Sequence, residues 1–165
     1  MSPRIINLDA IDPQTPPTYS PSDAAAAKFE MRMGAIATRI GAQKLGYNLT
    51  VVPPGKRAFP FHCHRVNEEM FFVLQGSGEV RIGEETFPIR QGDFIACPPG
   101  GPELAHQIIN SGSEELRYLS VSTRMYPEIA EYPDSGKFGV LAEYPPGADG
   151  KPQGFRFVGR PDTAS

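Results

Sequence analysis

The sequence has no tryptophan, 2 cysteines and 3 histidines among its 165 residues. The two cysteines, Cys63 and Cys97, provide no disulfide framework of the kind that small secreted domains use. No apolar run approaches the length of a membrane-spanning helix, and no charged-then-apolar signal segment opens the chain. The net charge of −3 argues against a surface for nucleic acid or anionic membranes. We therefore expect a cytoplasmic protein with neither kind of partner.

Proline and glycine are abundant, at 18 and 17 residues, and they separate short strand-like runs. Between Ile36 and Thr123, about seven or eight such runs alternate with turns of Gly, Pro, Asn or Ser. This spacing predicts an all-β domain, a sandwich or a small barrel, over residues 36–123. A hydrophobic content of 39% is enough for one core, and the absence of an internal repeat predicts a single barrel.

The two ends of the chain differ from this middle part. Residues 1–35 begin with a stretch rich in proline and polar groups, which predicts an extended arm. A brief helix is expected over residues 23–31, which are rich in alanine, with Gly34 ending it. Residues 124–165 are turn-rich and show no sustained period. We expect them to form an irregular extension that packs on the barrel or on a partner subunit.

The residues suited to chemistry gather in the stretch Gly55–Gly76. His62 and His64 are one residue apart, so on a strand they point to the same face while Cys63 points to the other. Two imidazoles with a carboxylate close behind form the kind of nitrogen and oxygen cluster that binds a divalent transition metal. The remaining histidine, His106, opens another strand-like run after a turn rich in glycine and proline.

Two adjacent carboxylates, Glu68 and Glu69, follow the first two histidines. Asn67 is a turn former, and the run that begins at the carboxylates predicts the next strand. Phe71 and Val73 share the strand face of Glu69, but the face of Glu68 is equally apolar. Periodicity alone therefore leaves open which of the two carboxylates points inward.

These stretches resemble the two sequence motifs of the cupin superfamily. The first motif is G-x5-H-x-H-x(3,4)-E-x6-G. Its fixed positions are matched by Gly55, His62, His64, Glu69 and Gly76. The sequence departs from it in having six residues in place of five after the first glycine. The second motif is G-x5-P-x-G-x2-H-x3-N. Its fixed positions are matched by Gly92, Pro98, Gly100, His106 and Asn110. The sequence departs from it in having five residues in place of two before the histidine. Together the motifs cover about the middle third of the chain and use every histidine in it.

The resemblance implies a double-stranded β-helix, or jelly-roll barrel, with irregular N- and C-terminal extensions. It also implies one divalent transition metal (Fe, Mn, Ni, Co or Zn), held inside by His62, His64, Glu69 and His106. The choice of Glu69 over Glu68 follows from the family's spacing to the final glycine of the motif. Small cupins commonly pair through sheet edges, so we expect a homodimer.

Three functions are compatible with these residues, and no catalytic residue is assigned. The leading hypothesis is a small-molecule enzyme of dioxygenase type, because Phe71 and Val73 predict apolar walls beside Glu69. The alternatives are a sugar or sugar-phosphate isomerase or epimerase, and a non-catalytic module that binds a small ligand. A phosphate would need basic partners, for which the candidates are Lys44, Lys56, Arg57 and Arg124. The candidates for contacts with the substrate are Tyr47, Phe71, Val73 and Tyr118.

Overall fold

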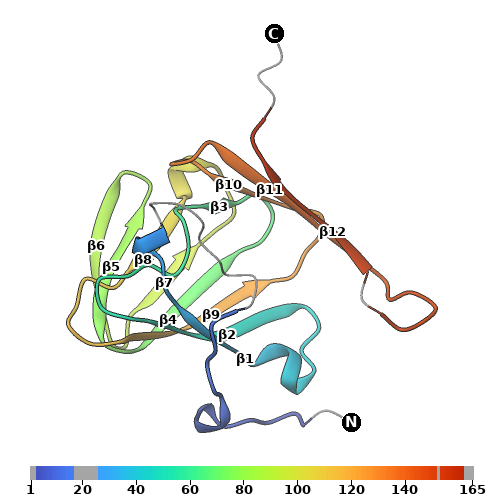
Figure 1. Cartoon of the computed structure of the whole chain (residues 1–165), viewed down its shortest axis with the longest axis horizontal. Coiled ribbons are helices and arrows are strands. Elements are labelled where there is room, and N and C mark those ends of the chain that lie inside the picture. Colours follow the sequence, from blue (N-terminus) through green and yellow to red (C-terminus); the bar gives the residue numbers. More distant parts are fainter. Residues whose placement is uncertain (1–2, 17–25, 152, 162–165) are drawn as a thin grey trace.

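The computed structural model describes residues 3–16, 26–151 and 153–161, and it consists mainly of β-strands (Figure 1). In chain order the strands are β1 (Arg32–Ala35), β2 (Leu45–Val52), β3 (Cys63–His64), β4 (Glu69–Gln75), β5 (Ser77–Ile82), β6 (Glu85–Arg90), β7 (Phe94–Cys97), β8 (His106–Ile109), β9 (Leu116–Thr123), β10 (Glu128–Tyr132), β11 (Lys137–Tyr144) and β12 (Gln153–Gly159). The helical elements are short 3-10 turns: η1 (Leu8–Ala10), η2 (Ala26–Lys28), η3 (Ala37–Ile40) and η4 (Pro102–Leu104). None of the helices described here is long and apolar enough to cross a membrane.

The strands pair in antiparallel fashion to form three sheets. One sheet has the order β1-β2-β9-β4-β7, the second β6-β5-β8, and the third β12-β11-β10-β3. Figure 1 shows β4, β9 and β2 along one side of the barrel, β5, β6 and β8 on another, and β3 with β10 closing the top. The predicted all-β jelly roll, a double-stranded β-helix, is confirmed.

The main core lies on the inner face of the five-stranded sheet. Phe71 and Val73 from β4 and Leu116 and Tyr118 from β9 are all at most 5% exposed, and they belong to one buried cluster. Cross-strand neighbours explain this packing, because Val73 pairs with Tyr118 and the ring centroids of Phe71 and Tyr118 lie 5.6 Å apart. The face of β4 that carries Glu69 is therefore the inner one.

The outer face of the same sheet is also apolar, and the N-terminal segment covers it. Leu49 and Val51 from β2 form a second cluster there with Ile11, which is 6% exposed, and Leu74 of β4 packs against them. The inner face of β4 is buried and its outer face is half-buried, and both contact apolar groups, which is why periodicity could not separate them. The part of the predicted arm described here packs on the barrel.

Gly34 lies within β1, where we expected it to end a helix. A Cβ atom at this position would lie 2.2 Å from Cγ2 of Ile11, so the missing side chain lets the arm approach the sheet. The strand containing Gly34 falls inside residues 1–35, which we predicted to be an arm. Of the helix expected over residues 23–31, Ala26–Lys28 forms a 3-10 turn, and residues 17–25 lie outside the described part of the chain.

The C-terminal extension is more regular than we expected. It supplies β10, β11 and β12, and β10 joins the barrel by pairing with β3, where Ala130 lies opposite His64. Figure 1 shows β11 and β12 as a long hairpin that projects from the barrel. Phe155 and Phe157 of β12 are 54% and 44% exposed. β12 is exposed on both faces, so it has no buried side of the kind that half-buried strands show.

Gly76 is a motif residue that the backbone requires. It joins β4 to β5 with a φ of 84°, a conformation that side chains other than glycine rarely adopt. A Cβ atom there would also lie 2.5 Å from the carbonyl oxygen of Glu115. This motif position is therefore explained by chain geometry and not by chemistry at the site.

Candidate metal centre and adjoining cavity

Strand pairing brings the three histidines together. His62 and His106 form an isolated antiparallel bridge, in which each backbone N–H donates to the other's carbonyl, at 3.1 Å from His62 and 2.8 Å from His106. The ring centroids of His62 and His106 lie 4.7 Å apart, and those of His62 and His64 lie 5.0 Å apart. Imidazoles from two motifs that are distant in the sequence therefore meet at one place.

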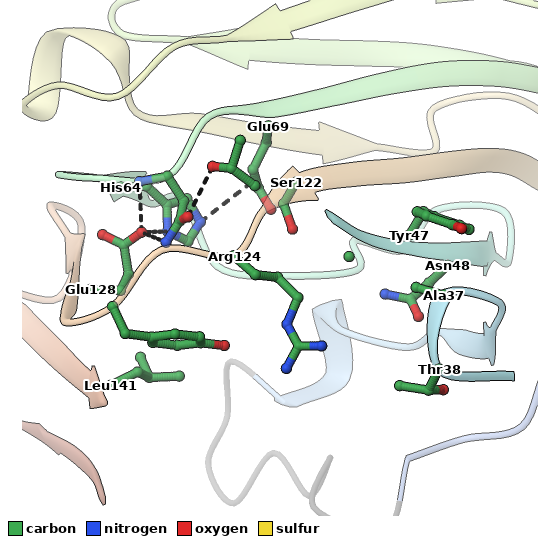
Figure 2. A pocket seen from close by; sticks show the side chains of 14 residues that line it. Ala37, Thr38, Tyr47, Asn48, His64, Glu69, Ser122, Arg124, Glu128 and Leu141 are labelled. Carbon is green, nitrogen blue, oxygen red and sulfur yellow. Dashed lines mark hydrogen bonds and ion pairs between the residues drawn. The ribbon is translucent and has the colours of Figure 1, made fainter. Parts of the chain in front are cut away.

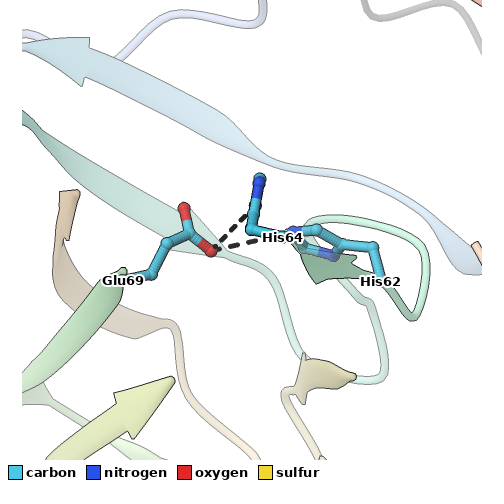
Figure 3. Close-up of side chains that lie close together, drawn as sticks. All are labelled: His62, His64 and Glu69. Carbon is cyan, nitrogen blue, oxygen red and sulfur yellow. Dashed lines mark ion pairs between the residues drawn. The ribbon is translucent and has the colours of Figure 1, made fainter. Parts of the chain in front are cut away.

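A single carboxylate oxygen faces all three rings. Oε2 of Glu69 lies 2.9 Å from Nε2 of His106. The same oxygen lies 3.3 Å from Nε2 of His64 and 3.7 Å from Nε2 of His62, the two contacts drawn in Figure 3. Glu68, by contrast, is exposed. Glu69 is thus the carboxylate that meets the histidines.

Burial and charge act against each other in this cluster. Burial raises the pKa of Glu69, but contacts with the three imidazoles, led by His106, outweigh it and hold that pKa well below its usual range. Burial lowers the pKa of His64, but the carboxylates of Glu69 and Glu128 outweigh it and raise that pKa. Burial lowers the pKa of His106 by more than Glu69 raises it. An ionised Glu69 and a neutral His106 are the forms that ligate a metal.

The ring nitrogens have the arrangement that a metal requires. Nδ1 of His62 donates to the carbonyl of Pro60 at 2.8 Å, which leaves the lone pair of Nε2 on the side of Glu69. Both ring nitrogens of His64 and Nδ1 of His106 are buried without a hydrogen-bond partner in the described structure. Buried polar atoms without partners are rare, and an ion at Nε2 of His64 would account for one of them.

The donor set suits a divalent transition metal. The ligand atoms of His62, His64 and Glu69 all lie within 4.8 Å of one another, and His106 adds a third imidazole in contact with the same carboxylate. Three nitrogens and one carboxylate oxygen are a common ligand set for Zn, Fe, Mn, Ni and Co. The residues present therefore fit the metal that the motifs imply, although they do not identify it.

A cavity of about 340 Å³ lies beside Glu69 and His64 (Figure 2). Most of the side chains that line it carry a hydroxyl, amide or charged group: Thr38, Tyr47, Asn48, Asn67, Ser122, Thr123, Arg124, Tyr126 and Glu128. In Figure 2 the Arg124 side chain extends between the end formed by His64 and Glu69 and the end formed by Tyr47 and Asn48. The cavity therefore combines the candidate metal ligands with a cation and several neutral polar groups.

Of the four side chains proposed to contact a substrate, Tyr47 lines this cavity. Phe71, Val73 and Tyr118 do not line it, because they lie in the buried core. The ring centroid of Phe71 lies 5.6 Å from that of His106, so Phe71 supports the site from within the barrel. β4 begins at Glu69, at the margin of the barrel, and its later inward side chains reach the core. The expected apolar walls are therefore not the walls of this cavity.

Arg124 and Glu128 complete the charged lining of the cavity. Arg124 was one of four basic candidates for binding a phosphate, and its position directly after β9 places it at the site. The other three candidates do not line the cavity: Lys44, Lys56 and Arg57. Glu128 carried no signal in the sequence, because only the pairing of β10 with β3 brings it beside His64.

Arg124 is held by a carboxylate from the C-terminal sheet. Its Nη2 contacts the two carboxylate oxygens of Glu143 at 2.8 and 3.0 Å, and the hydroxyl of Tyr126 donates to the same carboxylate at 2.8 Å. The Glu143 side chain is 50% exposed. An ion pair that is open to water contributes about 0–1 kcal/mol. A second anion can therefore compete with Glu143 for these donors.

Comparison with known proteins places this architecture in a family. Residues 48–122 match the family described as the cupin domain. An uncharacterised protein of Methanocaldococcus jannaschii is 34% identical over 76 residues, which cover 46% of this chain and 58% of that relative. The polyketide synthase CurC of Streptomyces cyaneus is 27% identical over 119 residues, covering 72% of this chain and 68% of CurC.

A solved structure from Silicibacter pomeroyi, a sugar phosphate isomerase from a cupin superfamily, is similar over nearly the whole chain. The two share 25% identity with a TM-score of 0.78, and the similarity covers 97% of this chain and 94% of the other. The similarity therefore extends beyond the two motifs into the terminal extensions. Together with the matching domain, the paired motif stretches and the jelly-roll topology, it shows that the chain belongs to the cupin superfamily.

Proposed function

We propose that this cupin is a metal-dependent isomerase of a small anionic polyhydroxy compound, with a sugar phosphate as the substrate class. The observation that carries the proposal is Arg124, a cation in the same cavity as Glu69 and His64. A charged guanidinium binds phosphate oxygens through strong, directional hydrogen bonds. The similarity to the Silicibacter pomeroyi isomerase over 97% of the chain supports the same class.

His62, His64, Glu69 and His106 are the residues that would hold the metal. Bound there, a divalent ion would act as a Lewis acid that polarises a substrate carbonyl or hydroxyl. The chain's own groups would bind and orient the rest of the substrate. The Arg124 guanidinium would hold the anionic end, in place of the Glu143 carboxylate that it contacts in this structure.

Neutral polar groups suit the hydroxyls of such a substrate. Tyr47, Asn48 and Ser122 line the cavity and carry groups that both donate and accept hydrogen bonds. The dioxygenase hypothesis depended on apolar walls formed by Phe71 and Val73, and neither residue lines this cavity. The presence of Arg124 in the cavity therefore favours binding of a polyhydroxy anion over oxygen chemistry.

The test is isomerisation of a panel of aldose and ketose phosphates by the metal-loaded protein, followed by NMR, with the unphosphorylated sugars run in parallel. Replacing Arg124 with methionine is expected to raise KM for a phosphorylated substrate by about 10–100-fold, because a hydrogen bond to a charged group is lost. Lys44→Met is the matched control, since the backbone carbonyl of Lys44 accepts from the N–H of Arg124 at 2.9 Å but Lys44 does not line the cavity.

Two results would contradict the proposal. One is substrate-dependent consumption of O₂ without isomerisation, which would restore the dioxygenase hypothesis. The other is turnover of phosphorylated sugars with the same KM in Arg124→Met and wild-type protein, which would place the anion elsewhere. Conversion of a polyketide without isomerisation would instead favour the activity suggested by the name of the relative CurC.

A homodimer also stays a prediction. The feature that supports it is β12, an edge strand of the four-stranded sheet with an exposed apolar surface. Unpaired edges of this kind are normally covered in native proteins.

A further inference from the structure

Glu128 is a buried carboxylate that the proposed chemistry does not use. It opens β10 in the C-terminal sheet and is 4% exposed. A charged side chain is rarely buried to this extent unless it is paired and hydrogen-bonded. Its surroundings therefore indicate what the carboxylate does.

Glu128 contacts the loop that joins β3 to β4. Oε1 of Glu128 accepts hydrogen bonds from the backbone N–H groups of Arg65 and Val66, both at 3.1 Å, and from that of Ile129 at 2.8 Å. Oε2 accepts from the backbone N–H of Asn67 at 2.8 Å and from its side-chain amide. The carboxylate thus holds the loop between His64, at the end of β3, and Glu69, at the start of β4.

Glu128 also lies beside the His64 ring. Oε2 of Glu128 lies 3.6 Å from Nδ1 of His64, on the side of the ring away from Glu69, whose Oε2 lies 3.3 Å from Nε2. Nδ1 of His64 is buried and has no hydrogen-bond partner in the described part of the chain. The imidazole therefore lies between two carboxylates, one at each ring nitrogen, as Figure 2 shows.

We propose that Glu128 is a positioning residue of the metal centre, which holds His64 with its proton on Nδ1 and the lone pair of Nε2 directed at the metal position. A histidine ligand usually donates its second ring N–H to a carboxylate or carbonyl, which fixes the ring and increases its basicity. His62 has such a partner in the carbonyl of Pro60. Glu128 is the corresponding partner for His64, and a shift of a few tenths of an ångström would bring the pair to hydrogen-bond distance.

Charge supports the same role. Glu69 and Glu128 place one carboxylate on either side of His64, an arrangement that favours positive charge at this position. β10 also fixes the backbone of His64, since Ala130 pairs with it across the sheet. The C-terminal sheet is therefore part of the metal centre through both its backbone and its carboxylate. This inference concerns metal binding and does not depend on the isomerase proposal.

The first test needs no substitution. In the metal-free wild-type protein, ¹⁵N NMR of the histidine rings at a pH where they are neutral is expected to show His64 with Nδ1 protonated and Nε2 bare. A carboxylate can only accept, so Glu128 favours a proton on Nδ1, whereas Glu69, at 3.3 Å from Nε2, favours one on Nε2. Oε2 of Glu69 already accepts from His106 at 2.9 Å, so we expect the contact with Glu128 to decide the tautomer. His64 protonated on Nε2 would overturn the proposal.

The second test compares Glu128→Gln with Glu131→Gln, measuring zinc affinity by competition with a chromophoric chelator. Glu131 lies on the same strand and contacts the side chain of Arg65, but it does not touch a histidine. Glu128→Gln is expected to weaken zinc binding by about 10–100-fold, and Glu131→Gln by less than about 3-fold. The Glu128→Gln protein is also expected to lose the single tautomer of His64, because glutamine both donates and accepts.

A purely structural clamp would give a different result. Glu128→Gln would then lower the stability of the fold while leaving the zinc affinity of the folded protein and the His64 tautomer unchanged, and this outcome would refute the positioning role. If Glu128→Gln does not fold, the tautomer measured in the wild-type protein decides the question.

Discussion

Replacing Glu69 with glutamine is expected to lower metal affinity by more than about 100-fold, while replacing Glu68 with glutamine leaves it unchanged. The estimate is a lower bound, because losing a partner outside the ligand set already costs about 10–100-fold. Glutamine keeps the size of Glu69 but removes the charge that faces all three imidazoles. Metal content after dialysis against a weak chelator, measured by mass spectrometry, gives the comparison directly.

Glu68 is the matched control because it is adjacent in the sequence and opposite in orientation. It is exposed, and its backbone N–H donates to the hydroxyl of Thr123 at 3.0 Å, a bond that the substitution leaves intact. Loss of metal in Glu68→Gln with retention in Glu69→Gln would show that the wrong carboxylate has been chosen. Equal retention in both variants would mean that neither carboxylate contributes to binding.

Replacing Asn110 with alanine is expected to destabilise the fold by about 2–4 kcal/mol, with little effect on metal content per folded molecule. Asn110 is fully buried, at 0% exposure. Its Nδ2 donates to the carbonyls of Val52 at 2.7 Å and Glu114 at 2.8 Å, and its Oδ1 accepts from the N–H of Gly112 at 3.0 Å. Alanine would leave these three backbone groups without their partner.

Gln107→Ala provides the control for this change. Gln107 is 4% exposed and lies on β8, close to Asn110 in the chain. In the described part of the chain its side chain makes one hydrogen bond, from Nε2 to the carbonyl of Phe59 at 2.8 Å. We expect a cost of about 1 kcal/mol. Urea denaturation of both variants measures the difference in free energy of unfolding. An Asn110→Ala cost no larger than that of Gln107→Ala would contradict the role assigned to Asn110.

The motif spacing predicted the convergence of the site well. His62 and His64 share a strand face, and the family's spacing selected Glu69 where the period of β4 could not. The reason for that ambiguity is visible in the fold, since the N-terminal segment buries the outer face through Ile11. The sequence shows that both faces of β4 are apolar. It does not show which face packs on the core and which packs on the N-terminal segment.

The cavity could not be predicted in the same way. Phe71 and Val73 point to the same side of β4 as Glu69. Glu69 reaches the cavity because it is the first residue of the strand, whereas Phe71 and Val73 lie further along it, in the core. Glu128 and Arg124 reach the site through pairing between strands far apart in the sequence, and no spacing rule records such pairing. β12 is exposed on both faces, so it has no buried face by which a sequence pattern identifies a strand.

The central claim is that His62, His64, Glu69 and His106 form one metal centre, and anomalous X-ray diffraction from metal-loaded crystals tests it most directly. The account predicts a single strong anomalous peak in contact with the three Nε2 atoms and a carboxylate oxygen of Glu69, at ligand distances of about 2.0–2.2 Å. A peak bound elsewhere in the chain, or no peak from protein incubated with zinc, manganese or iron, would contradict it.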